Sequence, residues 1–145
     1  MALRLLCVCT GNTCRSPMFR MLLIKALAEQ GRQATVDSAG TAAAGGEPAS
    51  AGAIAALRQR GLDLTRHRSR SLASLNLADY DHIYVVSSRH AAHMRSQGVP
   101  PERISVLAAA QGGVVDPWGG DQAAYEDCAA ALDEEAQRIA VSLGK

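Results

Sequence analysis

The chain has 145 residues, of which 48% are hydrophobic and 20% are charged, and these values are typical of one globular domain. Fifteen Lys and Arg residues nearly balance fourteen Asp and Glu residues. The formal net charge of +1 gives no general attraction to nucleic acid or to an anionic membrane, and an aromatic content of 3% leaves no stacking platform for nucleobases. We therefore expect a single domain over residues 1–145 that binds neither nucleic acid nor membranes.

The sequence also gives expectations about cellular location and cysteine chemistry. No apolar run approaches the about 18 to 20 residues of a membrane span, and the first residues lack a signal-peptide cleavage site, so a cytoplasmic protein is expected. Cys7, Cys9 and Cys14 lie close together, whereas Cys128 is far along the chain. A disulfide framework would spread its cysteines more evenly, so the crowding indicates chemistry.

Apolar segments that are typical of strands alternate along the chain with segments of helical periodicity. The expected strands are 2–9, 34–39, 82–87 and 104–107, and the expected helices are 16–30, a segment from about 53 to 61, 89–97 and 122–143. The Gly- and Ala-rich stretch 40–50 is expected to be a loop. Such alternation predicts an α/β fold, a single domain with a four-stranded parallel sheet and helices on both faces.

The segment between the first strand and the first helix reads V-C-T-G-N-T-C-R-S-P, from Val8 to Pro17. Ligands of open α/β sheets bind at this position, beyond the carboxyl end of a strand. The helix N-terminus offers unpaired N–H groups, and Gly11 and Asn12 are residue types that adopt left-handed conformations. The segment matches neither the Walker loop nor the dinucleotide fingerprint. It is therefore predicted to be an anion-binding loop of another kind.

Cys9 and Arg15 enclose five residues of this loop. Their spacing predicts that backbone N–H groups and the Arg15 guanidinium hold three phosphoryl oxygens while the Cys9 sulfur lies beneath the phosphorus. The positive field of the loop favours the Cys9 thiolate, and Ser16 is placed to donate a hydrogen bond to it. The expected phosphate-binding residues are Thr10, Gly11, Asn12, Thr13, Cys14 and Ser16.

The Cys-x5-Arg-Ser pattern directly after the first strand resembles the low-molecular-weight protein tyrosine phosphatase family. Further motifs follow in the order of that family: an S-A-G-T motif beginning at Ser38, and His67 followed by Arg70. The resemblance covers nearly the whole chain and implies a cysteine-dependent phosphatase that forms a phosphocysteine intermediate. It also implies that Asn12, Ser38 and His67 form a hydrogen-bond network that supports the loop.

The sequence V-D-P-W, which ends at Trp118, resembles the D-P-Y or D-P-F loop of the family, in which the aspartate is the general acid. The resemblance implies that Asp116 protonates the leaving group and then acts as base for the attacking water, an effect of about 10² to 10⁴ in rate. The structural alternative for Asp116 is an ordinary turn-initiating residue. Trp118 replaces the usual Tyr or Phe and is expected to affect specificity.

Thr13 precedes Cys14 at a position where tyrosine-specific members commonly carry Ile or Leu. With the later D-P-W-G-G, the loop most resembles the protein arginine phosphatase branch, which implies that Thr13 narrows the pocket and faces the substrate guanidinium. The stretch 42–46 lacks the aromatic residue that commonly walls the cleft, so one wall is expected to be bare. We expect phosphorylated proteins as substrates, phosphoarginine ahead of phosphotyrosine, inorganic phosphate as product, and a monomer.

Several alternatives accompany this interpretation. Cys14 is either a partner for a reversible disulfide with Cys9, as the family implies, or a packed thiol, and Cys7 and Cys128 are expected in the core. A zinc site at the clustered cysteines lacks the usual spacing and a fourth ligand, so neither metal nor cofactor is expected. The four histidines are expected at the surface or around the site.

Two other functions are alternatives for the whole chain. A thiol-linked arsenate reductase shares the loop but needs a later cysteine pair, and a non-catalytic phosphoprotein reader would not need Cys9 and Asp116.

Overall fold

The computed structural model describes residues 3–144. It contains, in order, β1 (Leu3–Cys9), α1 (Arg15–Glu29), β2 (Ala34–Gly40), α2 (Ala51–Arg58), β3 (His82–Val85), α3 (Ser88–Ser96), β4 (Ile104–Val106) and α4 (Gln122–Leu143), together with four single-turn 3-10 helices. Every predicted strand and helix is present, and the bounds differ by at most three residues. Ala2, the expected start of the first strand, lies outside the described residues.

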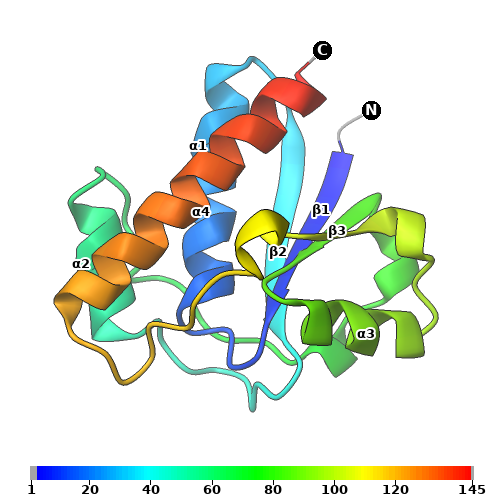
Figure 1. The fold of residues 1–145 in the computed structure, drawn as a ribbon, viewed down its shortest axis with the longest axis horizontal. Helices are drawn as coiled ribbons and strands as arrows, with labels where there is room; N and C mark the ends of the chain where they lie inside the picture. The colour runs from blue at the N-terminus through cyan, green and yellow to red at the C-terminus, as the bar shows by residue number, and fades with distance from the viewer. Residues whose placement is uncertain (1–2, 145) are drawn as a thin grey trace.

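The four strands form one parallel sheet in the order β2-β1-β3-β4. β1 is an inner strand that pairs with β2 from Leu3 to Cys9 and with β3 from Leu5 to Val8. An inner strand of a parallel sheet has both faces covered, which explains the nearly continuous apolar run of β1. Figure 1 shows β1 in the middle of the molecule, with its carboxyl end at the end opposite both termini.

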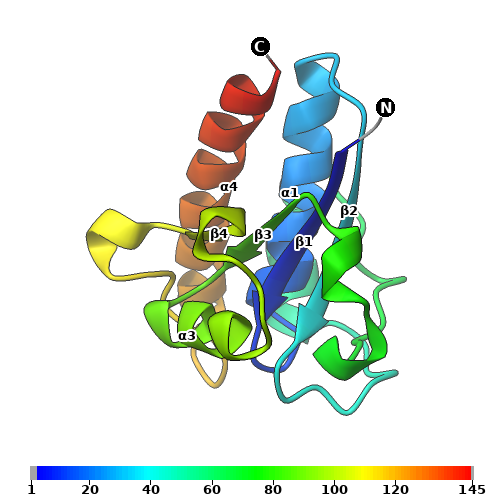
Figure 2. The same ribbon diagram turned by 90° about the vertical axis from the view of Figure 1, so that its right-hand side faces the viewer.

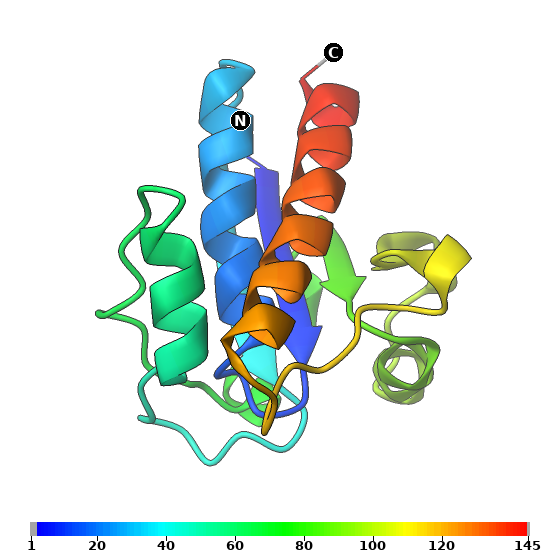
Figure 3. The same cartoon turned by 60° about the vertical axis from the view of Figure 1, so that its left-hand side comes forward.

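Helices cover both faces of the sheet, as the sequence predicted. α1, α2 and α4 lie on one face and α3 lies on the other, and Figures 2 and 3 show these layers from two sides. Side chains of β1 alternate between two core clusters: Leu5, Cys7 and Cys9 pack toward α1 and α4, whereas Leu6 and Val8 pack toward α3. No helix within residues 3–144 combines the length and apolar character needed to cross a bilayer.

The third strand is shorter than the predicted 82–87, because its last two residues serve other elements. The N–H of Val114 donates to the carbonyl of Val86 at 2.9 Å. The Ser87 hydroxyl accepts the N–H of His90 and thereby caps α3. A capping residue has non-helical, extended backbone angles, which the sequence pattern alone does not separate from a strand.

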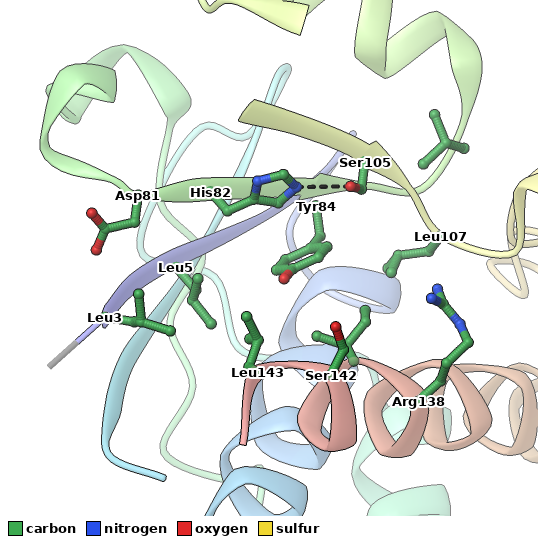
Figure 4. Close-up of a pocket in the computed structure, with 12 residues that line it drawn as sticks. Leu3, Leu5, Asp81, His82, Tyr84, Ser105, Leu107, Arg138, Ser142 and Leu143 are labelled. Carbon is green, nitrogen blue, oxygen red and sulfur yellow. Dashed lines mark hydrogen bonds between the residues drawn. The ribbon is translucent and has the colours of Figure 1, made fainter. Parts of the chain in front are cut away.

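A pocket of about 420 Å³ lies at the amino ends of the strands, between the sheet and the last turns of α4 (Figure 4). His82 Nε2 and Ser105 Oγ are hydrogen-bonded at 2.7 Å beside it, and Tyr84 and Arg138 also line it. None of the residues predicted to carry the chemistry lines this pocket. Those residues gather at the opposite end, where β1 meets α1.

Candidate active site

The predicted anion-binding loop connects the last residue of β1, Cys9, with the first residue of α1, Arg15. Cys14 precedes the helix, and no side chain of residues 3–144 caps the first turn of α1. The N–H groups of that turn are therefore available to a ligand, and the helix dipole adds positive potential at the same place. This arrangement is suited to binding a phosphoryl group.

The Cys9 sulfur is buried beneath the loop and receives polar contacts from two residues. The N–H of Asn12 donates to Cys9 Sγ at 3.3 Å, and Ser16 Oγ lies 2.9 Å from the sulfur. Because Ser16 Oγ already accepts a hydrogen bond from Asn12 Nδ2 at 2.7 Å, its own proton is available to the sulfur. Both contacts direct polar hydrogens at the sulfur, the atom that would act as nucleophile.

Asn12 is fully buried and holds the loop from its centre. Its Nδ2 donates to Ser16 Oγ and to Ser38 Oγ at 3.0 Å, and its Oδ1 accepts the N–H of Arg70 at 2.9 Å. Its carbonyl oxygen is 2.7 Å from Nε2 of His67, which must be the donor. Asn12 also has φ 58°, a left-handed conformation that Asn tolerates better than most residues. The structure thus brings together the three residues predicted to support the loop.

Arg15 lies at the wall of the site and is 8% exposed. Its Nη1 donates to the carbonyl oxygen of Val114 at 3.0 Å, and its Nη2 lies 3.6 Å from Oδ2 of Asp116. The Asp116 side chain is 52% exposed, and its Oδ1 accepts the N–H of Trp118 at 3.1 Å. The Asp116 carboxylate therefore both starts a turn and stands beside the guanidinium of Arg15.

The sequence interpretation did not identify Gly40 as a site residue. A Cβ atom at Gly40 would collide with the carbonyl oxygen of Thr10 and lie 3.0 Å from the backbone nitrogen of Asn12. Gly40 therefore lets β2 approach the back of the loop closely. Gly40 belongs to the S-A-G-T motif, but the resemblance of the motif alone does not explain why a glycine is needed at this position.

A second contact that was not predicted joins the loop to α3. His90 Nε2 lies 2.8 Å from Thr10 Oγ1, and His90 Nδ1 lies 2.6 Å from Ser87 Oγ. Burial, reinforced by the positive charges of Arg15 and Arg89, lowers the pKa of His90 to about 4. His90 is therefore neutral at pH 7 and connects Thr10 to the start of α3.

The other histidines agree with the expectation that they lie at the surface or around the site. His67 contacts the loop through Asn12, and burial lowers its pKa from the ordinary value. His82 lies at the far pocket of Figure 4, and His93 is exposed on α3. Neither His67 nor His90 is hydrogen-bonded to the Cys9 sulfur.

The loop opens into a pocket of about 350 Å³. Its lining combines loop residues with three residues from distant segments, Glu47, Asp116 and Trp118. Trp118 stands at the rim with 74% of its surface exposed. Thr13 lines the pocket, and no residue of 42–46 does so, which leaves Glu47 as the lining residue from that part of the chain. Glu47 was not predicted.

All four cysteines are buried free thiols. Cys7 and Cys128 lie in the core as expected; burial raises the pKa of Cys7 well above its ordinary value and that of Cys128 to about 12. Cys14 Sγ lies 3.2 Å from Ser50 Oγ and 3.8 Å from the hydroxyl of Tyr125. Cys14 therefore has packing partners in two other segments, and its proposed disulfide with Cys9 stays a prediction.

Comparisons with known proteins agree with this geometry. The model of the family described as low molecular weight phosphotyrosine protein phosphatase matches residues 4–145. A protein-arginine-phosphatase of Geobacillus stearothermophilus is 33% identical and covers 99% of this chain and 97% of its own length. A probable low molecular weight protein-tyrosine-phosphatase, EpsP of Ralstonia solanacearum, is 32% identical and covers 88% of this chain and 87% of its own.

Solved structures show the same likeness. A serine variant of the YwlE arginine phosphatase, with a phosphorylated active-site serine, superposes with a TM-score of 0.91 at 28% identity. The match covers 99% of this chain and 97% of that one. Taken with the sheet order and the loop between β1 and α1, these matches confirm the resemblance found in the sequence: the chain belongs to the low-molecular-weight phosphotyrosine protein phosphatase family.

Proposed function

We propose that this protein hydrolyses phosphorylated side chains of proteins through a phosphocysteine intermediate on Cys9, with phosphoarginine as the preferred substrate. The observation that carries the proposal is the placement of the Cys9 sulfur. It lies beneath an anion-binding loop, in contact with a backbone N–H and with the Ser16 hydroxyl, and it opens into the same pocket as Arg15. A nucleophile and the groups that stabilise negative charge are thus combined in one loop.

In the first step the Cys9 thiolate attacks phosphorus, and the bond from phosphorus to the substrate nitrogen or oxygen breaks. Arg15 and the loop N–H groups hold the three equatorial oxygens, where charge is spread in the transition state. Asp116, in its protonated form, donates its proton to the departing atom. Its place at the pocket mouth, next to Arg15, supports this role.

In the second step water attacks the phosphorus of phosphocysteine. The Asp116 carboxylate accepts a proton from that water, the phosphorus–sulfur bond breaks, and inorganic phosphate and the Cys9 thiolate result. Arg15 and the loop keep the phosphoryl oxygens in place through both steps. Because this scheme draws on side chains and backbone alone, we expect chelators to leave turnover unchanged.

Two observations support phosphoarginine as the preferred substrate. Thr13 lines the pocket, and relatives named protein-arginine-phosphatase align over nearly the full chain at 33% and 31% identity. Phosphotyrosine is the second candidate, because relatives named as tyrosine phosphatases align at 32% and 31% identity. We propose phosphorylated proteins as partners, the cytoplasm as the location, and a monomer as the active form.

The mechanism is tested by replacing the nucleophile. Cys9→Ser should abolish turnover of an aryl phosphate while vanadate still binds, because the loop that holds the oxygens is unchanged. Cys128→Ala, which removes a thiol outside this pocket, is the matched control and should keep its turnover. Full activity of Cys9→Ser would refute the mechanism.

The substrate preference is tested with matched peptides that carry either phosphoarginine or phosphotyrosine. The wild-type protein should give the higher kcat/KM on the phosphoarginine peptide, with Cys9→Ser as the blank for each. A higher kcat/KM on phosphotyrosine would overturn the preference and leave the phosphocysteine mechanism in place. Trapping phosphorus bonded to sulfur, by rapid quenching and ³¹P NMR, would report on the mechanism independently of the preference.

A further inference from the structure

The lining of this pocket carries charges of both signs. Arg15 and the loop attract an anion, whereas Glu47 and Asp116 add two carboxylates to the same lining. A ligand that fits this lining carries a negative and a positive charge close together. Phosphoarginine meets this condition, because its phosphoryl group is bonded to a guanidinium.

The two carboxylates differ in their partners. Asp116 lies 3.6 Å from Arg15 Nη2 and accepts the N–H of Trp118. The Glu47 carboxylate has neither a hydrogen bond nor an ion pair with any other residue of 3–144. Glu47 is therefore the carboxylate in this pocket whose charge is not already engaged, and it is available to a cation on the substrate.

The backbone of Glu47 is fixed although its side chain is not. Its N–H donates to Ser69 Oγ at 3.0 Å, and its carbonyl oxygen accepts the N–H of Ser69 at 2.7 Å. Ser69 is buried, and its carbonyl oxygen also accepts the N–H of Gly46 at 2.8 Å. These three hydrogen bonds hold the backbone of Glu47 at the pocket, so the position of its carboxylate depends on side-chain rotation alone.

We propose that Glu47 is a specificity-determining residue, which accepts hydrogen bonds from the substrate guanidinium and thereby favours phosphoarginine over phosphotyrosine. This inference rests on the proposed function and names the residue that selects its substrate. Trp118 lines the same pocket, and an indole ring attracts a cation that lies over its face. Phosphotyrosine brings a neutral ring to this place, so the Glu47 charge gains no partner and repels the incoming dianion.

The test compares Glu47→Gln with the wild type on matched phosphoarginine and phosphotyrosine peptides. An exposed charge pair is worth about 0.2–1 kcal/mol, so the ratio of the two kcat/KM values should fall by a factor of about 1.4 to 5. The loss on phosphoarginine should be mainly in KM, and kcat/KM on phosphotyrosine should rise. Because the effect is electrostatic, it should shrink as salt is raised from 0.05 to about 1 M.

Glu102→Gln is the matched control, since it makes the same change of net charge at an exposed residue outside the pocket. It should leave both kcat/KM values unchanged. The proposal is overturned if Glu47→Gln lowers both activities by the same factor, or if Glu102→Gln shifts the ratio equally. If the wild type does not hydrolyse phosphoarginine at all, both the proposed substrate and the role of Glu47 fail. If it does and the ratio does not move, only the role of Glu47 fails.

Discussion

Replacing Asn12 tests whether its buried amide organises the loop between Cys9 and Arg15. Asn12→Ala removes three side-chain hydrogen bonds, to Ser16, Ser38 and the N–H of Arg70, and all of them are buried or partly buried. At about 1 kcal/mol for each bond, their loss should lower the free energy of unfolding by about 3 kcal/mol. A left-handed φ of 58° adds about 1 kcal/mol for alanine, so the expected loss is about 4 kcal/mol.

Urea denaturation followed by circular dichroism measures this loss. Asn12→Gly separates the two contributions, because glycine adopts the same φ without strain and should lose about 1 kcal/mol less than alanine. Asn76→Ala is the matched control: Asn76 is exposed and caps a single 3-10 turn, so its loss should stay near about 1 kcal/mol.

Two results of the urea experiment would contradict the estimates for Asn12→Ala. A loss below about 1 kcal/mol, no larger than that of a typical single hydrogen bond, would refute the additive estimate and show that water or a neighbour replaces the amide. Equal losses for Asn12→Ala and Asn12→Gly would refute the contribution from φ. Turnover should fall with either variant, because the Asn12 amide positions Ser16 against the Cys9 sulfur.

Three further predictions concern other parts of the site. Gly40→Ala should lower kcat/KM by more than tenfold, because the added methyl group displaces the Thr10 carbonyl; wild-type turnover in a folded variant would contradict this. Arg15→Lys should lower kcat/KM by about 10² to 10³, since lysine lacks the planar fork, and a loss below tenfold would contradict it. Below pH 6.5 the unfolded state binds a proton at His90 that the folded state, with a pKa of about 4, does not. The free energy of unfolding should therefore fall as pH drops from 6.5 to 4. The urea midpoint of His90→Gln should fall less over this range than that of the wild type. Parallel plots of midpoint against pH for the two proteins would contradict this.

The fold was largely predictable because its determinants are local. The apolar runs of the strands and the 3.6-residue periodicity of the helices repeat in a strict alternation, which leaves few topologies besides a parallel sheet. The differences lie at element ends such as Ser87, where a capping side chain decides between strand and helix start. Capping depends on one hydrogen bond rather than on a repeated pattern, so periodicity does not detect it.

The gathering of Cys9, Arg15 and Asp116 around one pocket was predictable, because these residues are adjacent in the sequence or stand in a recognisable motif. Glu47 and the pair His90 and Thr10 were missed, because only the folded chain brings them to the loop. The partner of Arg15 at Val114 is a backbone carbonyl, which every residue carries and no sequence pattern marks.

The hydrogen bond from Arg15 to the carbonyl of Val114 joins residues 99 positions apart. As the chain is synthesised, the Arg15 guanidinium is made 99 residues before the carbonyl that it contacts. Contacts of such long range form slowly and late in folding. The Arg15 side chain should therefore reach its final position only after the segment around Val114 has been synthesised and has folded, and during refolding the recovery of turnover should lag behind the recovery of helix content.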